Sequence, residues 1–329
     1  YGGSMSYVVF YMAGLVLLFR CDHDISIDEF AISFISVLGK IFSCITLIQL
    51  LMPDVYEFVF EPFIMKNEEM DLDRVAGTYL NGFTNQVAIN AVYILFGIMA
   101  LILTGKRAKR YGNSVWIVLE VVSLLLTGKR MSILFGGFAI FIVLSLRESF
   151  TKKVKKIFIY SIAAVCVFFL ATFFVPQTRD TLLRFFIKAA SINEFSSGRF
   201  TLYAYAFDLF KNSPIWGNGW FSYAHSIVNY WGSRIHAHNI YLQLLCEVGI
   251  VGAALFCLAM FVSLYYSVKK LKAASDKREI RIYRFATAVQ LFYLFYGVTG
   301  NPIYDMHNLL LYFLVLSIAF NIGKRRSTD

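Results

Sequence analysis

The chain has 329 residues, of which 58% are hydrophobic and only 16% are charged, and its formal net charge is +10. A soluble globular domain is about 45–50% apolar and about 25% charged, so this composition excludes an ordinary soluble domain and favours an integral membrane protein. The basic residues gather in short loops and do not alternate with aromatic residues as in a single-strand binding groove, so we expect no nucleic-acid partner.

Apolar runs along the chain predict about nine transmembrane helices, since about 20 apolar residues cross a bilayer and lipid-embedded backbone must satisfy its hydrogen bonds within a helix. The predicted fold class is therefore all-α, a polytopic integral membrane protein with one transmembrane domain over 1–329. The first residue is Tyr1 rather than Met, as expected of a fragment or a processed form whose upstream spans are missing. The predicted spans are 5–19, 30–51, 85–104, 113–127, 131–146, 157–175, 239–267, 284–299 and 304–321.

The short basic loops predict the orientation of these spans. Clusters of Lys and Arg occupy 105–112, 147–156, 268–283 and the C-terminal tail, and threading the predicted spans brings all of them to one side. Positive residues mark the cytoplasmic side, so we expect a cytoplasmic C-terminus and a bilayer as the surrounding partner. The acidic loop 52–84 and the long loop 176–238 then lie on the outer side.

The long loop 176–238 is too long for a simple connector, and its Phe, Tyr and Trp content argues against disorder. Its apolar spacing predicts an interfacial helix over 179–190 and a second helix over 198–212. Pro214 is expected to end the second helix, and Gly217 and Gly219 mark a turn. This loop is where we expect the extracytoplasmic functional residues.

Three arginines on the outer side are candidate anion-binding residues. Arg130 follows a tight turn between two spans, and the alternative is an arginine that extends to the interface. Arg199 is expected at a helix start, where its positive charge is unfavourable with the helix dipole. A phosphate-like anion bound there would compensate for both positive charges, and the alternative is a solvated loop arginine. Arg74 lies in an acidic loop, where an ion pair with a neighbouring aspartate is equally compatible with the sequence.

Two histidines precede the span that begins near residue 239. His238 fits a general base or a phosphate donor, and a plain interfacial histidine is the alternative. Zinc bound by His236 and His238 is disfavoured, because no nearby Cys completes a site, so the expected metal is none. Asn239 can cap the span, and Glu247 is expected to be a buried, hydrogen-bonded carboxylate more readily than a base.

The chain resembles the O-antigen ligase and polymerase family of bacterial envelope glycan enzymes over about 70–325. The segments that carry the resemblance are DRVAGTYLNGFTNQ (73–86), LLLTGKRMSILFGG (124–137), SSGRFTLYAYAFDLFKNSPIWGNGW (196–220) and HNIYLQLLCEVGIVGAALF (238–256). One departure is Lys129 before Arg130, where members of the family often carry a serine.

The resemblance implies a GT-C-like helical glycosyltransferase that acts on undecaprenyl-pyrophosphate-linked glycans at the outer face of the bacterial cytoplasmic membrane, without a cofactor or metal. It implies catalytic roles for Arg130, Arg199 and His238, the arginines binding the pyrophosphate, with Arg74 assisting. We add as substrate-binding residues Asn239, His236, Arg234, Gly217 and Gly219.

We favour a polymerase of capsule or O-antigen repeat units, because the outer loop is of moderate size and no soluble domain is appended. The first alternative is an O-antigen ligase that transfers the glycan to lipid A core or another acceptor. The second, from a different class, is a transporter of lipid-linked glycans. Further partners would be the glycan acceptor and other polysaccharide assembly proteins.

Overall fold

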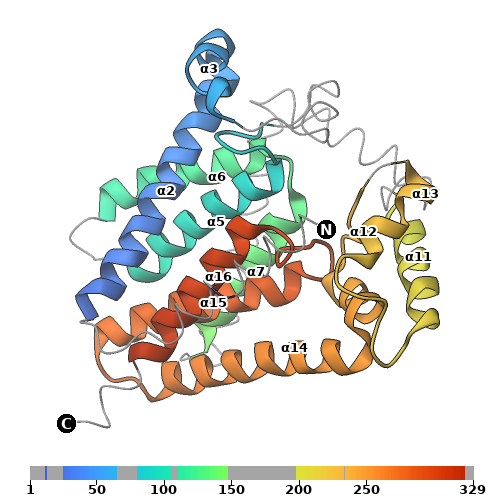
Figure 1. Ribbon diagram of the computed structural model, residues 1–329. Helices are drawn as coiled ribbons and strands as arrows, with labels where there is room; N and C mark the ends of the chain where they lie inside the picture. The colour runs from blue at the N-terminus through green and yellow to red at the C-terminus, as the bar shows by residue number, and fades with distance from the viewer. Residues whose placement is uncertain are drawn as a thin grey trace. The chain divides into compact units, whose positions relative to one another are not determined.

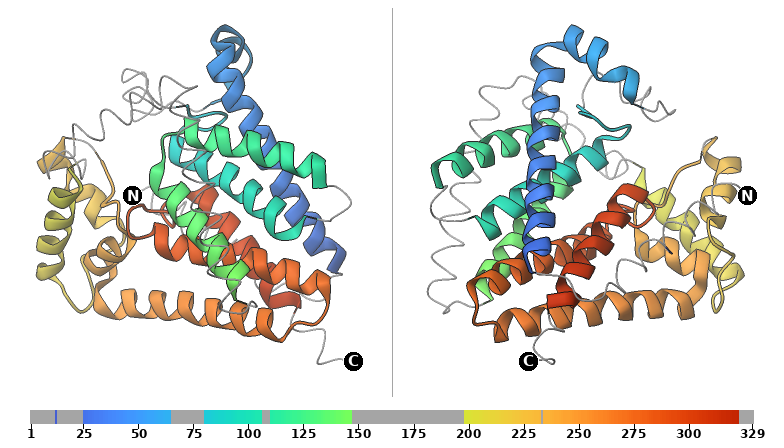
Figure 2. Two further views of the ribbon diagram at one scale, coloured as in Figure 1. Left: turned by 180° about the vertical axis from the view of Figure 1, so that it is seen from behind. Right: turned by 60° about the vertical axis from the view of Figure 1, so that its left-hand side comes forward.

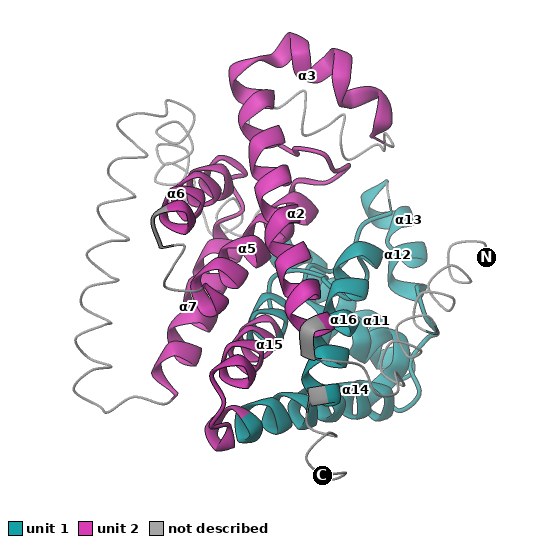
Figure 3. Cartoon of the chain, turned by 90° about the vertical axis from the view of Figure 1, so that its left-hand side faces the viewer, with its two compact units in different colours: residues 1–22, 185–270, 290–329 teal, residues 23–184, 271–289 magenta. Residues whose placement is uncertain are grey.

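The structure, a computed structural model, describes residues 12, 25–64, 80–105, 110–146, 198–232 and 234–322. Over these residues the chain is helical and contains no β-strand, in agreement with the predicted all-α class (Figure 1). Two compact units divide the chain (Figure 3). Residues 1–22, 185–270 and 290–329 form the first unit, and residues 23–184 and 271–289 form the second.

The second unit is built on the packing of three apolar helices: α2 (Ile25–Leu51), α5 (Val87–Thr104) and α6 (Arg110–Leu126) contact one another, as the views of Figure 2 show. A Cβ atom added to Gly39 of α2 would lie 2.5 Å from the Cα of Gly97 on α5. Glycine at both positions therefore permits the close backbone approach that small residues give to membrane helices. The remaining elements are α3 (Pro53–Val59), the 3-10 helix η1 (Glu61–Phe63) and α7 (Arg130–Ser145), which packs on α5 and α6.

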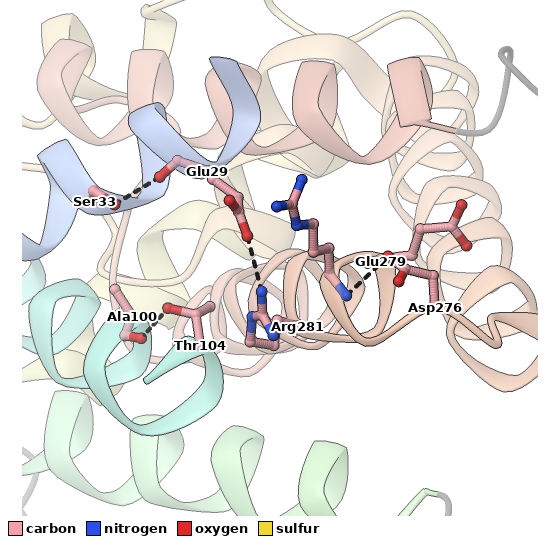
Figure 4. Close-up of polar contacts among 8 residues, drawn as sticks. Glu29, Ser33, Ala100, Thr104, Asp276, Glu279 and Arg281 are labelled. Carbon is pink, nitrogen blue, oxygen red and sulfur yellow. Dashed lines mark hydrogen bonds and ion pairs between the residues drawn. The ribbon is translucent and has the colours of Figure 1, made fainter. Parts of the chain in front are cut away.

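The first turns of α15 (Lys277–Tyr296) also belong to this second unit. The carboxylate of Asp276 accepts hydrogen bonds from the backbone N–H groups of Arg278, at 2.9 Å, and Glu279, at 3.1 Å, and so caps the helix. Arg281 then donates to the carboxylate of Glu29 on α2 at 2.8 Å (Figure 4). Because of this cap, α15 begins at residue 277, earlier than the predicted span 284–299.

The first unit contains α11 (Arg199–Asn212), α12 (Ser222–Ser226), α13 (Val228–Trp231), α14 (Ile240–Ala273) without its last residues, the C-terminal part of α15, and α16 (Met306–Ile322). The described part of the long loop 176–238 packs into an apolar core, in agreement with the prediction from its aromatic content that it is not disordered. Leu202 and Ala206 of α11 pack with Tyr223 and Ile227 beneath them and with Cys246 of α14. Helix α11 confirms the predicted helix over 198–212.

Three helical segments in the described part of the chain are long and apolar enough to cross a membrane: Ile27–Leu51, Val87–Thr104 and Ile240–Ala273. Shorter apolar helices cover Gly112–Leu126, Arg130–Ser145 and Met306–Asn321. Helices thus occupy the predicted spans 30–51, 85–104, 113–127, 131–146, 239–267, 284–299 and 304–321. The predicted spans 5–19 and 157–175 and the predicted interfacial helix 179–190 lie outside the described residues.

Helix α14 differs from the uninterrupted span expected over 239–267. Gly249 has φ 70° and ψ −176°, which lies far from helical values, so the helix is broken at this residue. Only glycine adopts this backbone conformation readily. The stretch before the break carries the polar residues of the motif. The stretch after it, Ile250 to Ala273, is about 36 Å long at 1.5 Å per residue and is apolar until the lysines of its last turns.

Candidate functional site

The broken part of α14 is held by the segment that follows α11, so two of the motifs singled out in the sequence contact each other. The backbone N–H groups of Asn218 and Gly219 donate to the carbonyls of Cys246 and Glu247, both at 2.9 Å. In the other direction, the N–H of Ile250 donates to the carbonyl of Pro214 at 2.9 Å. These bonds replace those that the helix loses at Gly249, which a membrane protein must satisfy within the protein.

The contact requires a glycine in each of the two backbone segments, Gly217 after α11 and Gly249 in α14. A Cβ atom on Gly217 would lie 2.3 Å from the carbonyl oxygen of Glu247, and one on Gly249 would lie 2.2 Å from that of Ile215. Gly219, with φ 100°, also needs the freedom of glycine, although its Cβ position is open. Gly217 and Gly219 therefore have a role in the fold, and their predicted role in substrate binding stays a prediction.

His238 and Asn239 form the corner at which α14 begins. The side-chain oxygen of Asn239 accepts hydrogen bonds from the backbone N–H groups of Tyr241, at 3.0 Å, and Leu242, at 3.1 Å, which confirms the predicted helix cap. His238 precedes it with φ 53°, an uncommon value for a residue other than glycine, and its side chain is exposed. Backbone of this kind recurs at functional sites.

Helix α11 is tied to this corner through Tyr203. The Tyr203 hydroxyl donates to the backbone carbonyl of His238 at 3.3 Å and lies 3.4 Å from the carbonyl of Val298. Arg199 is the first residue of α11 and lies one turn before Tyr203, on the same helix face. Burial raises the pKa of the Tyr203 hydroxyl, and the charge of Arg199 acts in the opposite direction. Arg199 and His238, two of the predicted site residues, thus lie in segments that contact each other through Tyr203.

A buried polar network lies behind this corner and centres on Gln243. Its side-chain nitrogen lies 3.0 Å from Nδ1 of His236 and donates to Glu247 at 3.0 Å. Its side-chain oxygen accepts from the backbone N–H of Ala237, at 3.1 Å, and from the side chain of Asn301, at 3.0 Å. Burial lowers the pKa of His236 to about 4, so this histidine is neutral at pH 7.

Glu247 is fully buried in this network, as the sequence indicated. Its second carboxylate oxygen accepts a 2.7 Å hydrogen bond from the Tyr304 hydroxyl. The Tyr304 ring stacks on Trp220, with centroids 5.1 Å apart, and meets the His236 ring at the same centroid distance. Phe221, which also has a positive φ of 68°, contacts both Tyr304 and His236. The carboxylate is therefore a structural acceptor that orders an aromatic wall.

The remaining predicted residues lie elsewhere. Arg130 belongs to the second unit, where it is exposed and is the first residue of α7, directly after the predicted tight turn. Arg234 is exposed, two residues before His236. Arg74 lies outside the described residues. Among the described residues, no group of three or more His, Cys, Asp or Glu side chains could hold a metal ion.

The second unit carries another of the quoted motifs, LNGFTNQ (80–86), in a polar cluster of its own. Gln49 of α2 donates to the side chain of Asn81 at 2.7 Å and accepts from the backbone N–H of Gly82 at 2.9 Å. The Tyr56 hydroxyl donates to the carbonyl of Gly82 at 2.6 Å, and Asn90 donates to Thr46 at 2.9 Å. These contacts fix the entry into α5.

Sequence reasoning missed Tyr203, Gln243, Asn301 and Tyr304. One signal for Gln243 was present, because Asn239, Gln243 and Glu247 recur every fourth residue in an otherwise apolar helix and so share one face. The others contact the site from distant parts of the chain, and nothing in their local sequence indicates it.

The apolar helices define a helical, multi-pass membrane protein. A comparison with known protein families matches residues 113–257 to the family described as O-antigen ligase. Over these residues the chain is similar to that family, which confirms the resemblance seen in the sequence. The match includes Arg130, Arg199 and His238 and the contact between Gly217 and Gly249. A search of curated proteins finds no match.

Proposed function

We propose that the protein is a membrane glycosyltransferase that polymerises undecaprenyl-pyrophosphate-linked oligosaccharide repeat units, as in capsule or O-antigen synthesis. The observation that carries the proposal is the hydrogen bond from Tyr203 to the backbone carbonyl of His238, because Tyr203 lies one turn after Arg199 in α11. An arginine on a helix that contacts the segment of an exposed histidine suits transfer from a pyrophosphate leaving group. The family match supports the same class of reaction.

The proposed reaction breaks one bond and forms one bond. A hydroxyl oxygen of the acceptor glycan attacks the sugar carbon that is bonded to pyrophosphate, and the bond from this carbon to the phosphate oxygen breaks. The electron pair remains on undecaprenyl pyrophosphate, where Arg199 stabilises the added charge through paired hydrogen bonds. His238 removes the proton of the attacking hydroxyl. No cofactor or metal enters this scheme.

Further residues extend the proposed site. Arg130, which also starts a helix, is proposed as a second pyrophosphate ligand, and Arg74 and Arg234 as residues that attract the anionic substrate. We place this chemistry on the outer face of a bacterial cytoplasmic membrane, with the C-terminus in the cytoplasm, because the basic loops favour that orientation. Other polysaccharide assembly proteins are proposed partners.

An O-antigen ligase is the second candidate, and the description of the matched family favours it. A ligase would use the same donor and leaving group but would transfer the glycan to lipid A core or another acceptor. The arrangement of Arg199, Tyr203 and His238 serves either reaction, since donor activation is common to both. The two candidates differ only in the acceptor hydroxyl.

The test uses purified protein in lipid nanodiscs with one undecaprenyl-pyrophosphate-linked repeat unit as the only glycan. The reaction is run with and without EDTA and is read on a gel. We expect a ladder of products that persists in EDTA and disappears in His238→Ala. His225→Ala is the matched control, because His225 is also an exposed histidine of the first unit and was given no role.

Each other result points to a specific alternative. Absence of a ladder, with product formed only after lipid A core is added, would identify a ligase. Movement of the lipid-linked glycan across the membrane without a new glycosidic bond would identify a transporter and contradict the proposal. A ladder that is unchanged in His238→Ala would remove His238 from the transfer centre.

A further inference from the structure

The orientation of the Gln243 amide is fixed by its neighbours. The backbone N–H of Ala237, 3.1 Å from the Gln243 side chain, can only donate a hydrogen bond, so the atom that faces it is the amide oxygen. Asn301 donates to the same oxygen at 3.0 Å. The amide nitrogen, which can only donate, therefore faces Glu247 and His236.

This orientation determines where His236 carries its proton. The amide nitrogen of Gln243 lies 3.0 Å from Nδ1 of His236, so Nδ1 must accept and cannot carry a proton. A neutral imidazole then holds its proton on Nε2. If His236 were doubly protonated, its Nδ1–H would face the amide N–H of Gln243, and neither donor would have an acceptor at this contact. His236 is half-buried, and Nε2 is the ring nitrogen that the contact with Gln243 leaves available.

We propose that Gln243 is a positioning residue that locks His236 as the neutral Nε2–H tautomer, and that this N–H donates to an oxygen of the lipid-linked substrate. The second half of the proposal rests on the proposed function. Phosphate and sugar hydroxyl oxygens both accept such a bond, and the aromatic wall of Trp220 and Tyr304 beside the imidazole can border either. His236 is then a donor only, because its one free lone pair is occupied by Gln243.

The two histidines of the motif thus have different chemistry. His238 is exposed, and the proposed function gives it the removal of a proton during transfer. His236 is locked, and its role is that of a fixed hydrogen-bond donor. The titratable and charged groups around His236 are Glu247, which is linked to it through Gln243, Tyr304, whose ring contacts it, and Arg234 in its own segment.

The tautomer is tested by ¹⁵N NMR of the full chain in nanodiscs with labelled histidine. The chain has five histidines, so the signals of His236 are identified by their loss in His236→Asn. We expect one Nε2–H imidazole that does not titrate between about pH 5.5 and 8. Gln243→Leu should give a mixture of tautomers. Gln243→Glu should move the proton to Nδ1 or give imidazolium, because a carboxylate now accepts there.

Gln290→Leu is the matched control, since Gln290 is also a buried glutamine, bonded to Ser267 at 2.7 Å, and its loss should leave His236 unchanged. An Nδ1–H tautomer or an imidazolium in the wild type at pH 7 would overturn the lock. So would an unchanged His236 spectrum in Gln243→Leu. These readings require no transfer activity, so they are separate from the proposed function.

The substrate half is tested by titration and by activity. A shift of the Nε2 signal on addition of undecaprenyl pyrophosphate alone identifies a phosphate oxygen, and a shift only with the complete lipid-linked glycan identifies a sugar oxygen. His236→Gln, whose amide can donate near the position of Nε2, should keep transfer within about tenfold of the wild type, and His236→Leu should lose more. No shift with either ligand would refute the substrate contact while leaving the tautomer result intact.

Discussion

The hydroxyl of Tyr203 donates to the backbone carbonyl of His238 at 3.3 Å, which joins the middle of α11 to the corner before α14. Arg199 lies one helical turn before Tyr203. The arginine and the histidine are 39 residues apart in the chain (238 − 199), yet a single side chain spans the space between their elements. The two motif segments that carry these residues are thus parts of one structural assembly.

Arg199→Lys should lower transfer activity by roughly 10- to 100-fold, because lysine keeps the charge but cannot make the planar paired hydrogen bonds of a guanidinium. Lys211→Ala is the control, since Lys211 is exposed at the other end of α11 and contacts only the exposed Asp208 and Phe207 of the same helix among the described residues. Initial rates with the lipid-linked repeat unit measure the effect. Equal rates for Arg199→Lys and the wild type would contradict pyrophosphate binding by Arg199.

Asn239→Ala should destabilise the protein by about 1 kcal/mol, because it removes the side-chain oxygen that caps α14. Asn239→Asp keeps this acceptor and should retain stability. Asp276→Ala removes the equivalent cap of α15, far from the candidate site in sequence, and should cost a similar amount. Thermal unfolding in detergent gives the stabilities. Activity should fall further in Asn239→Ala than in Asp276→Ala, and a parallel loss in both would indicate that Asn239 acts through stability alone.

Gly249→Ala should prevent correct folding or destabilise the protein by several kcal/mol, because the new Cβ would lie 2.2 Å from the backbone oxygen of Ile215 and φ would remain at 70°. Gly137→Ala is the matched control. Gly137 lies inside α7 with open space around its Cβ position, so alanine there should be neutral or stabilise by about 0.5–1 kcal/mol. Yield after size-exclusion chromatography and the unfolding midpoint distinguish the two variants.

Glu120→Gln should leave the unfolding midpoint unchanged or raise it. Glu120 on α6 is fully buried, and neither carboxyl oxygen has a hydrogen-bond partner in the described part of the chain. One of these oxygens would lie 3.0 Å from a Cβ atom on Gly97, within the closely packed α2, α5 and α6. An amide of the same shape removes an ionisable group whose burial is costly. A large loss of stability in Glu120→Gln would show that the carboxylate itself is needed.

The sequence was sufficient to predict what depends on local chemistry. Apolar runs predicted α2, α5 and α16, and Asn239 was recognised as a cap, because both follow from neighbouring residues. The break in α14 could not be predicted, since it depends on the approach of Ile215, which lies 34 residues before Gly249 (249 − 215).

The candidate site was predicted in part for the same reason. Arg199, His238 and Asn239 stand at element ends, where a side chain that opposes or caps a helix dipole is visible in the sequence. Tyr203 and Tyr304 resemble the many other tyrosines of the chain until the fold shows which carbonyl or carboxylate each hydroxyl reaches. Contacts between distant segments depend on how the helices pack, and the hydrophobic periodicity of the sequence does not predict them.

Acidification should weaken the folded state through His236. Its pKa is lowered from an ordinary value of 6.5 to about 4 by burial, so between these values the unfolded chain binds a proton that the folded chain does not. Stability that is present above about pH 6.5 is therefore lost progressively as the pH falls toward 4. The decrease in unfolding midpoint between pH 7 and 5 should be smaller in His236→Gln, which cannot titrate, than in the wild type, and His225→Gln serves as the exposed control. Equal decreases in the wild type and His236→Gln would show that other groups cause the acid sensitivity.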